Sequence, residues 1–222
     1  MRKIFKAELQ ALGDDLTQMA ELVNKAITGA SHALLNGDLD TAQQVIVDDQ
    51  QIDDLERSLD ERCVLLLAQQ QPVATDLRLV VTALRMSATL ERMGDLARHI
   101  AQVARRAYPT TAVPAQCTPI FEGMAGAAQR VATRIHGLLD SHDLDMAQTI
   151  EEDDEILDNF HTDVFSTLLG GEWEGTPQQT IDVTLLSRYF ERFGDHGVSV
   201  ARRMTFVVTG DFHRAATNDA VS

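Results

Sequence analysis

The sequence predicts an all-α fold built from two tandem three-helix bundles that are related by an internal repeat. Apolar residues recur at steps of three and four along six segments of the 222-residue chain, as they do on the buried face of an amphipathic helix. The pentapeptide ERMGD at residues 91–95 returns as ERFGD at residues 191–195. No alternating apolar pattern of useful length indicates β-strands.

The first bundle is expected over residues 1–107. Its first helix should stop at Gly37, because glycine is typical of helix C-termini. The second helix should begin near Asp38, whose side chain can cap it, and should end before Pro72. The apolar stripes of the three helices run over residues 5–33, 45–66 and 79–104.

A proline-rich segment, residues 108–119, is expected to link the two bundles. Its three prolines would break any helix. The second bundle is expected over residues 120–210, and residues 211–222 are expected to form a flexible tail. Its apolar stripes run over residues 121–138, 150–164 and 183–204.

The two halves also match in their letters. HALLNGDLDTA at residues 32–42 resembles HGLLDSHDLDMA at residues 136–147, apart from one insertion. Self-similarity of this kind indicates duplication of one structural unit. The short connections between helices predict antiparallel neighbours and an up-down-up arrangement in each half.

Pairs of acids four residues apart are the candidate functional groups. On a helical wheel, Glu91 and Asp95 share a face that lies about 150° from the apolar seam, at roughly 100° per residue. Asp49 and Asp53 are placed in the same way on the preceding helix. Both pairs lie equally far from the turn that joins the two helices, so we expect them at one height. The second half repeats the construction with Asp154, Asp158, Glu191 and Asp195.

Four carboxylates at one height would repel one another unless a cation offsets their charge. Oxygen-only clusters suit Mg²⁺, Mn²⁺ or Ca²⁺, and carboxylate-rich helical bundles also hold iron. The expected sites are shallow and solvated because the acids face outward. A single acidic stripe is usually only a solvated face, but two level pairs present in two copies favour metal. The candidate ligands are Asp49, Asp53, Glu91, Asp95, Asp154, Asp158, Glu191 and Asp195.

Several residues beside the acids have two interpretations. Gly94 and Gly194 interrupt helices, where glycine costs about 1 kcal/mol against alanine. Their recurrence suggests close packing or access to the acids, and a tolerated small residue is the alternative. His99 and His196 could reach a cation, but neither recurs in the other half, so we expect polar surface side chains. Trp173 lies in a predicted turn, either as a docking point or folded back over the bundle.

Composition narrows the classes of function. A formal net charge of −15 disfavours non-specific nucleic-acid binding and direct adsorption to anionic lipid. Two cysteines without a C-x-x-C motif predict reduced thiols in a cytoplasmic protein. The longest apolar run, CVLLLA, is too short to span a bilayer. Any contact with the inner face of the membrane should therefore pass through partners. No catalytic-nucleophile motif is found.

The motifs quoted above make the chain resemble the PhoU family, the regulators associated with bacterial phosphate-specific transport. The resemblance covers nearly the whole chain, through LGDDLTQMAELV, VATDLRLVVTALRMSATLERMGD and LLSRYFERFGDH. Paired E/D-x-x-x-D motifs are the family's hallmark. Four of them in register are specific: DQQID, ERMGD, DEILD and ERFGD. His99 departs from the asparagine that family members often carry one turn after the first-half motif.

The resemblance implies metal ions bound by these motifs, with Mg, Mn, Fe and Zn as candidates. It also implies negative regulation of phosphate-starvation signalling and of phosphate uptake. The implied partners are a phosphate-sensing histidine kinase, the ATPase subunit of the phosphate ABC transporter, and a second copy in a homodimer. Our first hypothesis is thus a non-enzymatic adaptor. The alternatives are a carboxylate-bridged metalloenzyme, which usually needs inward-facing histidine ligands, and a helical scaffold whose acids serve solubility alone.

Overall fold

Long α-helices make up almost all of the computed structural model, which describes residues 2–211 and, from residue 5 onward, their side chains. One short 3₁₀ turn, η1 (Ala115–Cys117), precedes the fourth helix, and no strand occurs in residues 2–211. The all-α prediction is confirmed. The helices are α1 (Arg2–Asn36), α2 (Leu39–Gln70), α3 (Thr75–Ala107), α4 (Thr118–Ser141), α5 (Asp145–Leu169) and α6 (Pro177–Thr209).

The helix ends follow local backbone chemistry. Gly37 adopts a φ of +65°, a conformation that glycine takes without steric cost. Asp38 then caps α2 by accepting a hydrogen bond from the Thr41 backbone N–H at 3.1 Å. Thr176 and Gln179 form a reciprocal capping box at the start of α6. These caps fix where the long helices begin and end.

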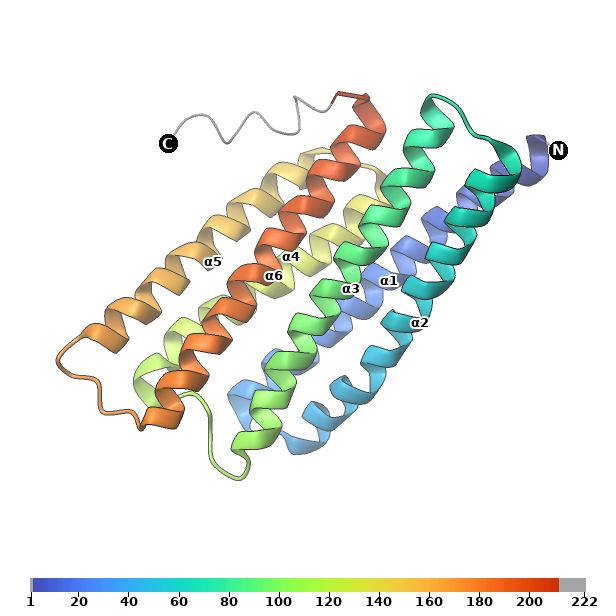
Figure 1. The fold of residues 1–222 in the computed structure, drawn as a ribbon. Coiled ribbons are helices and arrows are strands. Elements are labelled where there is room, and N and C mark those ends of the chain that lie inside the picture. The colour runs from blue at the N-terminus through green and yellow to red at the C-terminus, as the bar shows by residue number, and fades with distance from the viewer. Residues whose placement is uncertain (1, 212–222) are drawn as a thin grey trace.

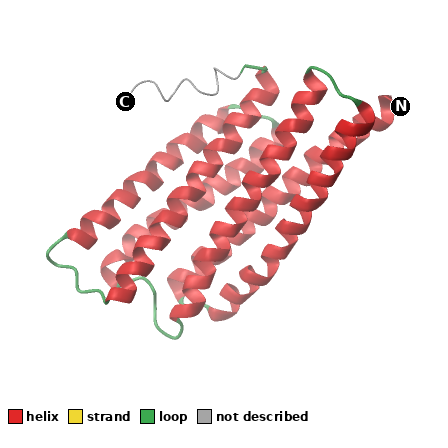
Figure 2. Cartoon of the chain, in the orientation of Figure 1, coloured by secondary structure: helices red, strands yellow, loops and turns green. Residues whose placement is uncertain are grey.

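The six helices form two three-helix units that lie side by side. Helices α1, α2 and α3 contact one another, as do α4, α5 and α6. The units join through α1 against α4 and α3 against α6, with α2 and α5 at the outer flanks. All six helices run along a common direction (Figures 1 and 2). Helices α3 and α6 therefore form the front of the joint between the two repeats.

A single hydrophobic cluster extends through both repeats. Phe121 and Phe190 are completely buried, with ring centroids 6.2 Å apart. Burying a side chain of this size contributes about 1.5–3 kcal/mol. Cys63 and Cys117 are buried within the same cluster as free thiols. The two repeats are thus tied together by a shared core.

Other predictions can be placed on this frame. Helix α3 ends at Ala107, as the expected linker begins, but α4 already begins at Thr118, so the last two residues of that segment, including Pro119, belong to the first turn of α4. The expected tail lies outside the described residues, apart from Asp211. Within the described part of the chain, no helix combines the length and the apolar character needed to cross a membrane.

Candidate functional site: two acid clusters between helices

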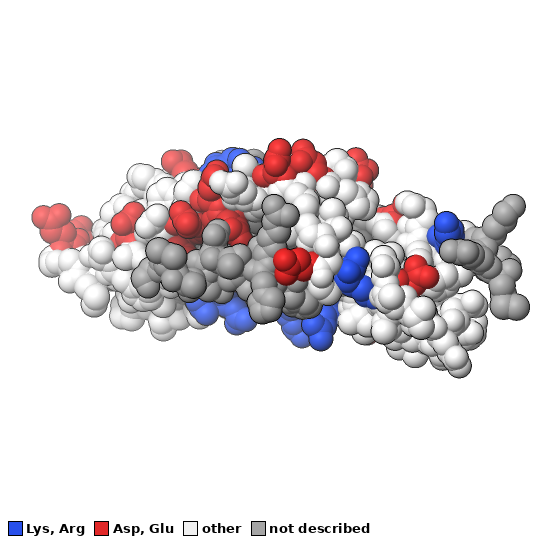
Figure 3. All heavy atoms as spheres, turned by 90° about the horizontal axis from the view of Figure 1, so that it is seen from above, with Lys and Arg blue, Asp and Glu red and all other residues white. Residues whose placement is uncertain are grey.

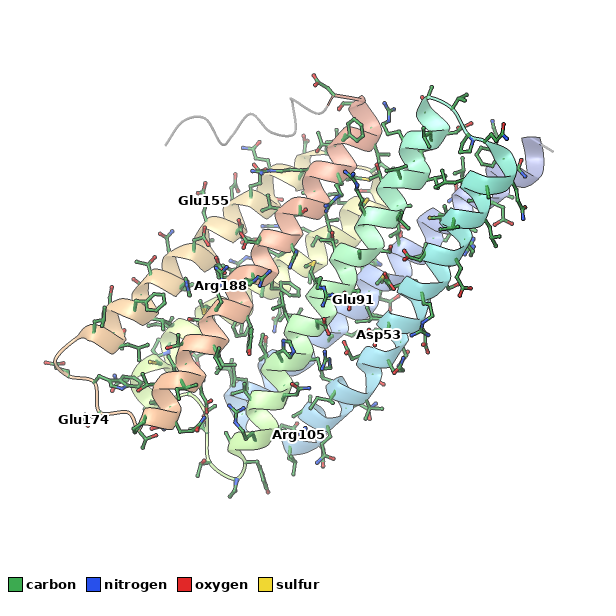
Figure 4. The ribbon with its side chains drawn as sticks, in the orientation of Figure 1. Asp53, Glu91, Arg105, Glu155, Glu174 and Arg188 are labelled. Atoms are coloured by element: carbon green, nitrogen blue, oxygen red, sulfur yellow. The ribbon has the colours of Figure 1, made fainter. Side chains whose placement is uncertain are left out.

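The N-terminal acid cluster consists of Asp49 and Asp53 on α2 and Glu91 and Asp95 on α3. Figure 4 shows Asp53 and Glu91 near one another on the two neighbouring helices. Burial, followed by the charge of Asp95 and then that of Asp53, raises the pKa of Glu91 to about 7. The structure therefore brings the two acid pairs of the first repeat into electrostatic contact.

Arg98 neutralises much of this first cluster. Its Nε lies 2.5 Å from Asp49 Oδ2, as an ion pair rather than an aligned hydrogen bond, and its Nη2 donates to Asp95 Oδ1. Arg92 adds a second cation, with Nη1 2.7 Å from Asp95 Oδ2. Sequence analysis did not single out Arg98. Its position three residues after Asp95 was the available signal, since such residues meet on a helix.

The C-terminal acid cluster consists of Asp154 and Asp158 on α5 and Glu191 and Asp195 on α6. Burial raises the pKa of Asp154 to about 7, with further contributions from the charges of Asp158, Asp195 and Glu191. Burial and the charge of Asp195 raise the pKa of Asp158 as well. The four acids of the second repeat are thus also brought together.

This second cluster lacks an equivalent of Arg98. Val198 holds the corresponding position. Among the described residues, Asp154, Asp158 and Asp195 form no ion pair, and Arg188 pairs only with Glu191. Asp154 Oδ1 and Glu191 Oε2 are buried without a hydrogen-bond partner. The cluster therefore keeps an excess of negative charge and two unsatisfied oxygens, an arrangement that costs stability in a metal-free protein.

Glycines bring the helices close together at both clusters. A Cβ added at Gly94 would lie 2.8 Å from Ile52 Cδ1 and 3.4 Å from Asp49 Oδ1. A Cβ added at Gly194 would overlap the Asp154 carboxylate and lie 2.8 Å from Leu157 Cδ1. The close-packing interpretation of these glycines is therefore the one that the structure supports.

Some of the acids lie deeper than we expected. Asp49 is only 7% exposed, and the Glu191 side chain only 12%. The helical wheel of an isolated helix placed the acids on a solvated face. In the structure, that face lies against the equivalent face of the neighbouring helix. Close approach at the glycines then removes water from the innermost carboxylates. The expectation of shallow, solvated sites is therefore wrong for Asp49 and Glu191, but it holds for Asp158 and Asp195, which are exposed.

The donor chemistry of the C-terminal acid cluster fits a hard cation. Its ligands are all oxygens, and its charge is not balanced within the described residues. As the side chains stand, however, no three acidic, histidine or cysteine groups of the described residues converge on one metal position. A metal would require carboxylates to turn toward it. In the N-terminal acid cluster it would also have to displace Arg98.

Two of the remaining candidates contact neighbouring side chains. The His99 ring lies 5.2 Å from the Tyr189 ring across the joint between the repeats. His161, which was not among the candidates, has its Nδ1 3.0 Å from Ser187 Oγ. Trp173 folds back, with Nε1 donating to Thr180 Oγ1 at 2.9 Å. The second interpretation of Trp173 is thus the one that the structure supports.

Fold and site together define an internally duplicated helical protein with one acid cluster in each repeat. A family model for the PhoU domain matches residues 16–104 and 121–204, one match in each repeat. The chain belongs to the PhoU family.

Relatives match over nearly their whole length. The chain is 41% identical over 212 residues to the Phosphate-specific transport system accessory protein PhoU homolog 2 of Mycobacterium tuberculosis, covering 96% of this chain and 100% of that protein. It is 32% identical to the PhoU homolog of Rhizobium meliloti, covering 93% of this chain and 87% of that one. The similarity therefore extends across both repeats.

Solved structures agree with this assignment. The crystal structure of PhoU from Pseudomonas aeruginosa superimposes with a TM-score of 0.84 at 28% identity, covering 93% of this chain and all of that one. The phosphate transport system regulatory protein PhoU from Streptococcus pneumoniae gives a TM-score of 0.82 at 22% identity, covering 94% and 98% of the two chains, which supports the fold alone.

Proposed function

We propose that this protein is an accessory regulator of phosphate transport that represses phosphate uptake and phosphate-starvation signalling. The observation that carries the proposal is the match of the whole chain to relatives named as accessory proteins of the phosphate-specific transport system. Both repeats, both acid clusters and the joint between them fall inside that match. The similarity that supports the proposal therefore extends over both repeats.

The regulator would act as an adaptor between two partners. These are a phosphate-sensing histidine kinase and the ATPase subunit of the phosphate ABC transporter. A surface with a large excess of acids suits basic partner surfaces, because complementary charge speeds association and favours the correct partner. Self-association as a homodimer is part of the same proposal, and light scattering of the purified protein would measure it.

Metal binding would support the adaptor role. The C-terminal acid cluster would take a divalent or iron-type ion through Asp154, Asp158, Glu191 and Asp195. Such an ion would offset the repulsion that raises the pKa of Asp154 and would hold α5 against α6. Two buried carboxylate oxygens without partners support this assignment. A bound cation would also give an acidic surface a point at which it can contact an acidic partner.

The metalloenzyme alternative has less support. Carboxylate-bridged bundle enzymes build their site in the bundle core, with histidine ligands. Here each acid cluster lies between two helices of one repeat, and His161 is hydrogen-bonded to Ser187. We therefore propose a non-enzymatic regulator.

Complementation and co-purification test the function. In a host strain that lacks its own family member, we expect the wild-type chain to lower a phosphate-starvation reporter and phosphate uptake in phosphate-rich medium. We also expect the tagged chain to retain the kinase and the transporter ATPase. An exposed-surface variant, Asp163→Asn, serves as the control and should behave as wild type. Unchanged uptake together with no co-purification, with or without phosphate, would contradict the proposal.

A further inference from the structure

A pocket of about 810 Å³ lies between α3 and α6, at the joint between the two repeats. Pockets of about 300–1,000 Å³ commonly hold small-molecule ligands. Asp154 and Asp195 of the C-terminal acid cluster reach one part of its wall. The rest of the wall is different in character, because it carries four guanidinium groups from two helices: Arg78, Arg85, Arg202 and Arg203.

Four arginines around one pocket are unexpected in a chain with 34 acids and 19 lysines and arginines. Seen from above, basic atoms gather along the lower edge of the molecule, whereas acidic atoms, with one basic group among them, predominate along the upper edge (Figure 3). The lower edge is thus locally richer in basic groups than the upper edge. A basic concavity on an acidic protein indicates a local role for positive charge.

Among the described residues, three of these arginines have no acidic partner. No carboxylate of residues 5–211 lies within ion-pair distance of Arg78, Arg85 or Arg203, whereas Arg202 pairs with Glu151 at 3.3 Å. Burial, followed by the charge of Arg85, lowers the pKa of Arg203. Arg85 and Arg203 are therefore like charges that lie near one another with no carboxylate of residues 5–211 paired to either.

The contacts that these arginines do make are with neutral groups. Arg203 Nη1 donates to Thr89 Oγ1 at 2.9 Å and to Ser199 Oγ at 2.6 Å. Arg78 donates through Nη2 to the Val207 carbonyl at 3.3 Å, and its buried Nε has no partner. These contacts orient the guanidinium groups without neutralising them. Donors therefore remain for an anion that enters the pocket.

We propose that this pocket binds a small anion that carries two or more phosphate groups, such as pyrophosphate or a nucleoside di- or triphosphate. A guanidinium offers paired N–H groups that match the oxygens of a phosphate. Several such groups around one pocket suit several phosphates better than one. The pocket is also larger than a single phosphate needs, and Leu77, Val81 and Phe206 give it an apolar wall for an organic group.

Calorimetric titration of the full-length protein in EDTA tests this proposal with any metal ion removed from the acid clusters. The probes are pyrophosphate, ATP, orthophosphate and citrate, the last as a multivalent anion without phosphate. We expect pyrophosphate or ATP to bind at least about tenfold more tightly than orthophosphate or citrate, as additional charge-assisted hydrogen bonds would give. Tighter binding of ATP than of pyrophosphate would assign the apolar wall to the base, and equal binding would assign the site to the phosphate chain. Either result supports the proposal.

Arg85→Gln is the decisive variant, because the Arg85 side chain has no hydrogen bond or ion pair to lose among the described residues. The matched control is Arg57→Gln, which removes the same charge from the exposed surface of α2. We expect Arg85→Gln to weaken binding about tenfold or more, and Arg57→Gln to leave it unchanged. Circular dichroism verifies that both variants fold.

Three results would overturn the proposal. They are no saturable binding of pyrophosphate or ATP at millimolar concentration, equal binding of citrate, and equal losses in the two variants. None of them bears on regulation of phosphate transport, since that is measured by complementation. The pocket and the proposed function can therefore fail separately.

Discussion

Arg98 and Val198 occupy equivalent positions in the two repeats, yet only Arg98 contacts the acids beside it. Arg98 forms ion pairs with Asp49 and Asp95, whereas Val198 is a buried apolar residue of the core. The duplicated helix pairs have therefore diverged in charge. In the first acid cluster one arginine pairs with acids on both helices, whereas in the second cluster Arg188 pairs with Glu191 of its own helix.

Replacing Arg98 by valine should make the first cluster resemble the second. Asp49 would then be buried without its cation, and we expect the free energy of unfolding to fall by about 2–4 kcal/mol, as for other buried pairs that lose one partner. Millimolar Mn²⁺ should recover part of this loss. Urea denaturation with and without Mn²⁺ measures both effects.

The control for Arg98→Val is Arg92→Ala. The Arg92 side chain is 64% exposed, so we expect its loss to cost less than about 1 kcal/mol. Equal stability of the two variants would contradict the assignment of Arg98 as the main neutralising group.

The acid cluster of the second repeat should make stability depend on pH. The pKa of Asp154 is raised from 3.8 to about 7 in the folded protein. The folded state therefore keeps a proton that the unfolded chain releases. Stability from this group is fully present below about pH 4 and is lost as the pH rises to about 7.

Asp154→Asn should remove this pH-dependent loss of stability, because asparagine carries no charge at any of these pH values. In EDTA, we expect wild type to lose about 1–2 kcal/mol more than Asp154→Asn between about pH 5 and pH 8. Asp163→Asn, an exposed position on the same helix, should retain the wild-type dependence. Urea denaturation of the three proteins at both pH values provides the test, and parallel behaviour of all three would count against a buried acid cluster.

Gly194→Ala should destabilise the protein although alanine favours helices. The new methyl group would displace the Asp154 carboxylate and press on Leu157, so we expect a loss of about 1–3 kcal/mol. Gly13→Ala is the matched control, because a Cβ there meets nothing within 4 Å. We expect Gly13→Ala to add about 0.5–1 kcal/mol. Thermal denaturation compares the stabilities of the two variants. Higher stability of Gly194→Ala than of wild type would show that the helices can separate at no cost.

Much of the architecture could be predicted because it depends on local rules. Gly37 ends the first helix because glycine takes a positive φ at no steric cost, and the Asp38 side chain caps the next helix. The level arrangement of the acid pairs follows from the fixed rise of an α-helix and the position of the turn between two antiparallel helices. Repetition of the pattern then indicated that both halves share one structure.

The rest depends on contacts that no single helix contains. The depth of Asp49 arises only when α3 approaches α2 at Gly94. The arginine pocket is formed by side chains of α3 and α6, which belong to different repeats. From the sequence alone, Arg98 could not be distinguished from other charged residues, because its partner Asp49 lies on another helix.

Titration of the metal-free protein with Mn²⁺ tests the central claim most directly, which is that the acid cluster of the second repeat takes up a metal ion. Calorimetry should show saturable binding to wild type, near-complete loss of this binding in an Asp154→Asn and Asp195→Asn double variant, and an additional binding event in Arg98→Val. Saturable binding that is unchanged in the double variant, or no binding to wild type at all, would contradict the claim.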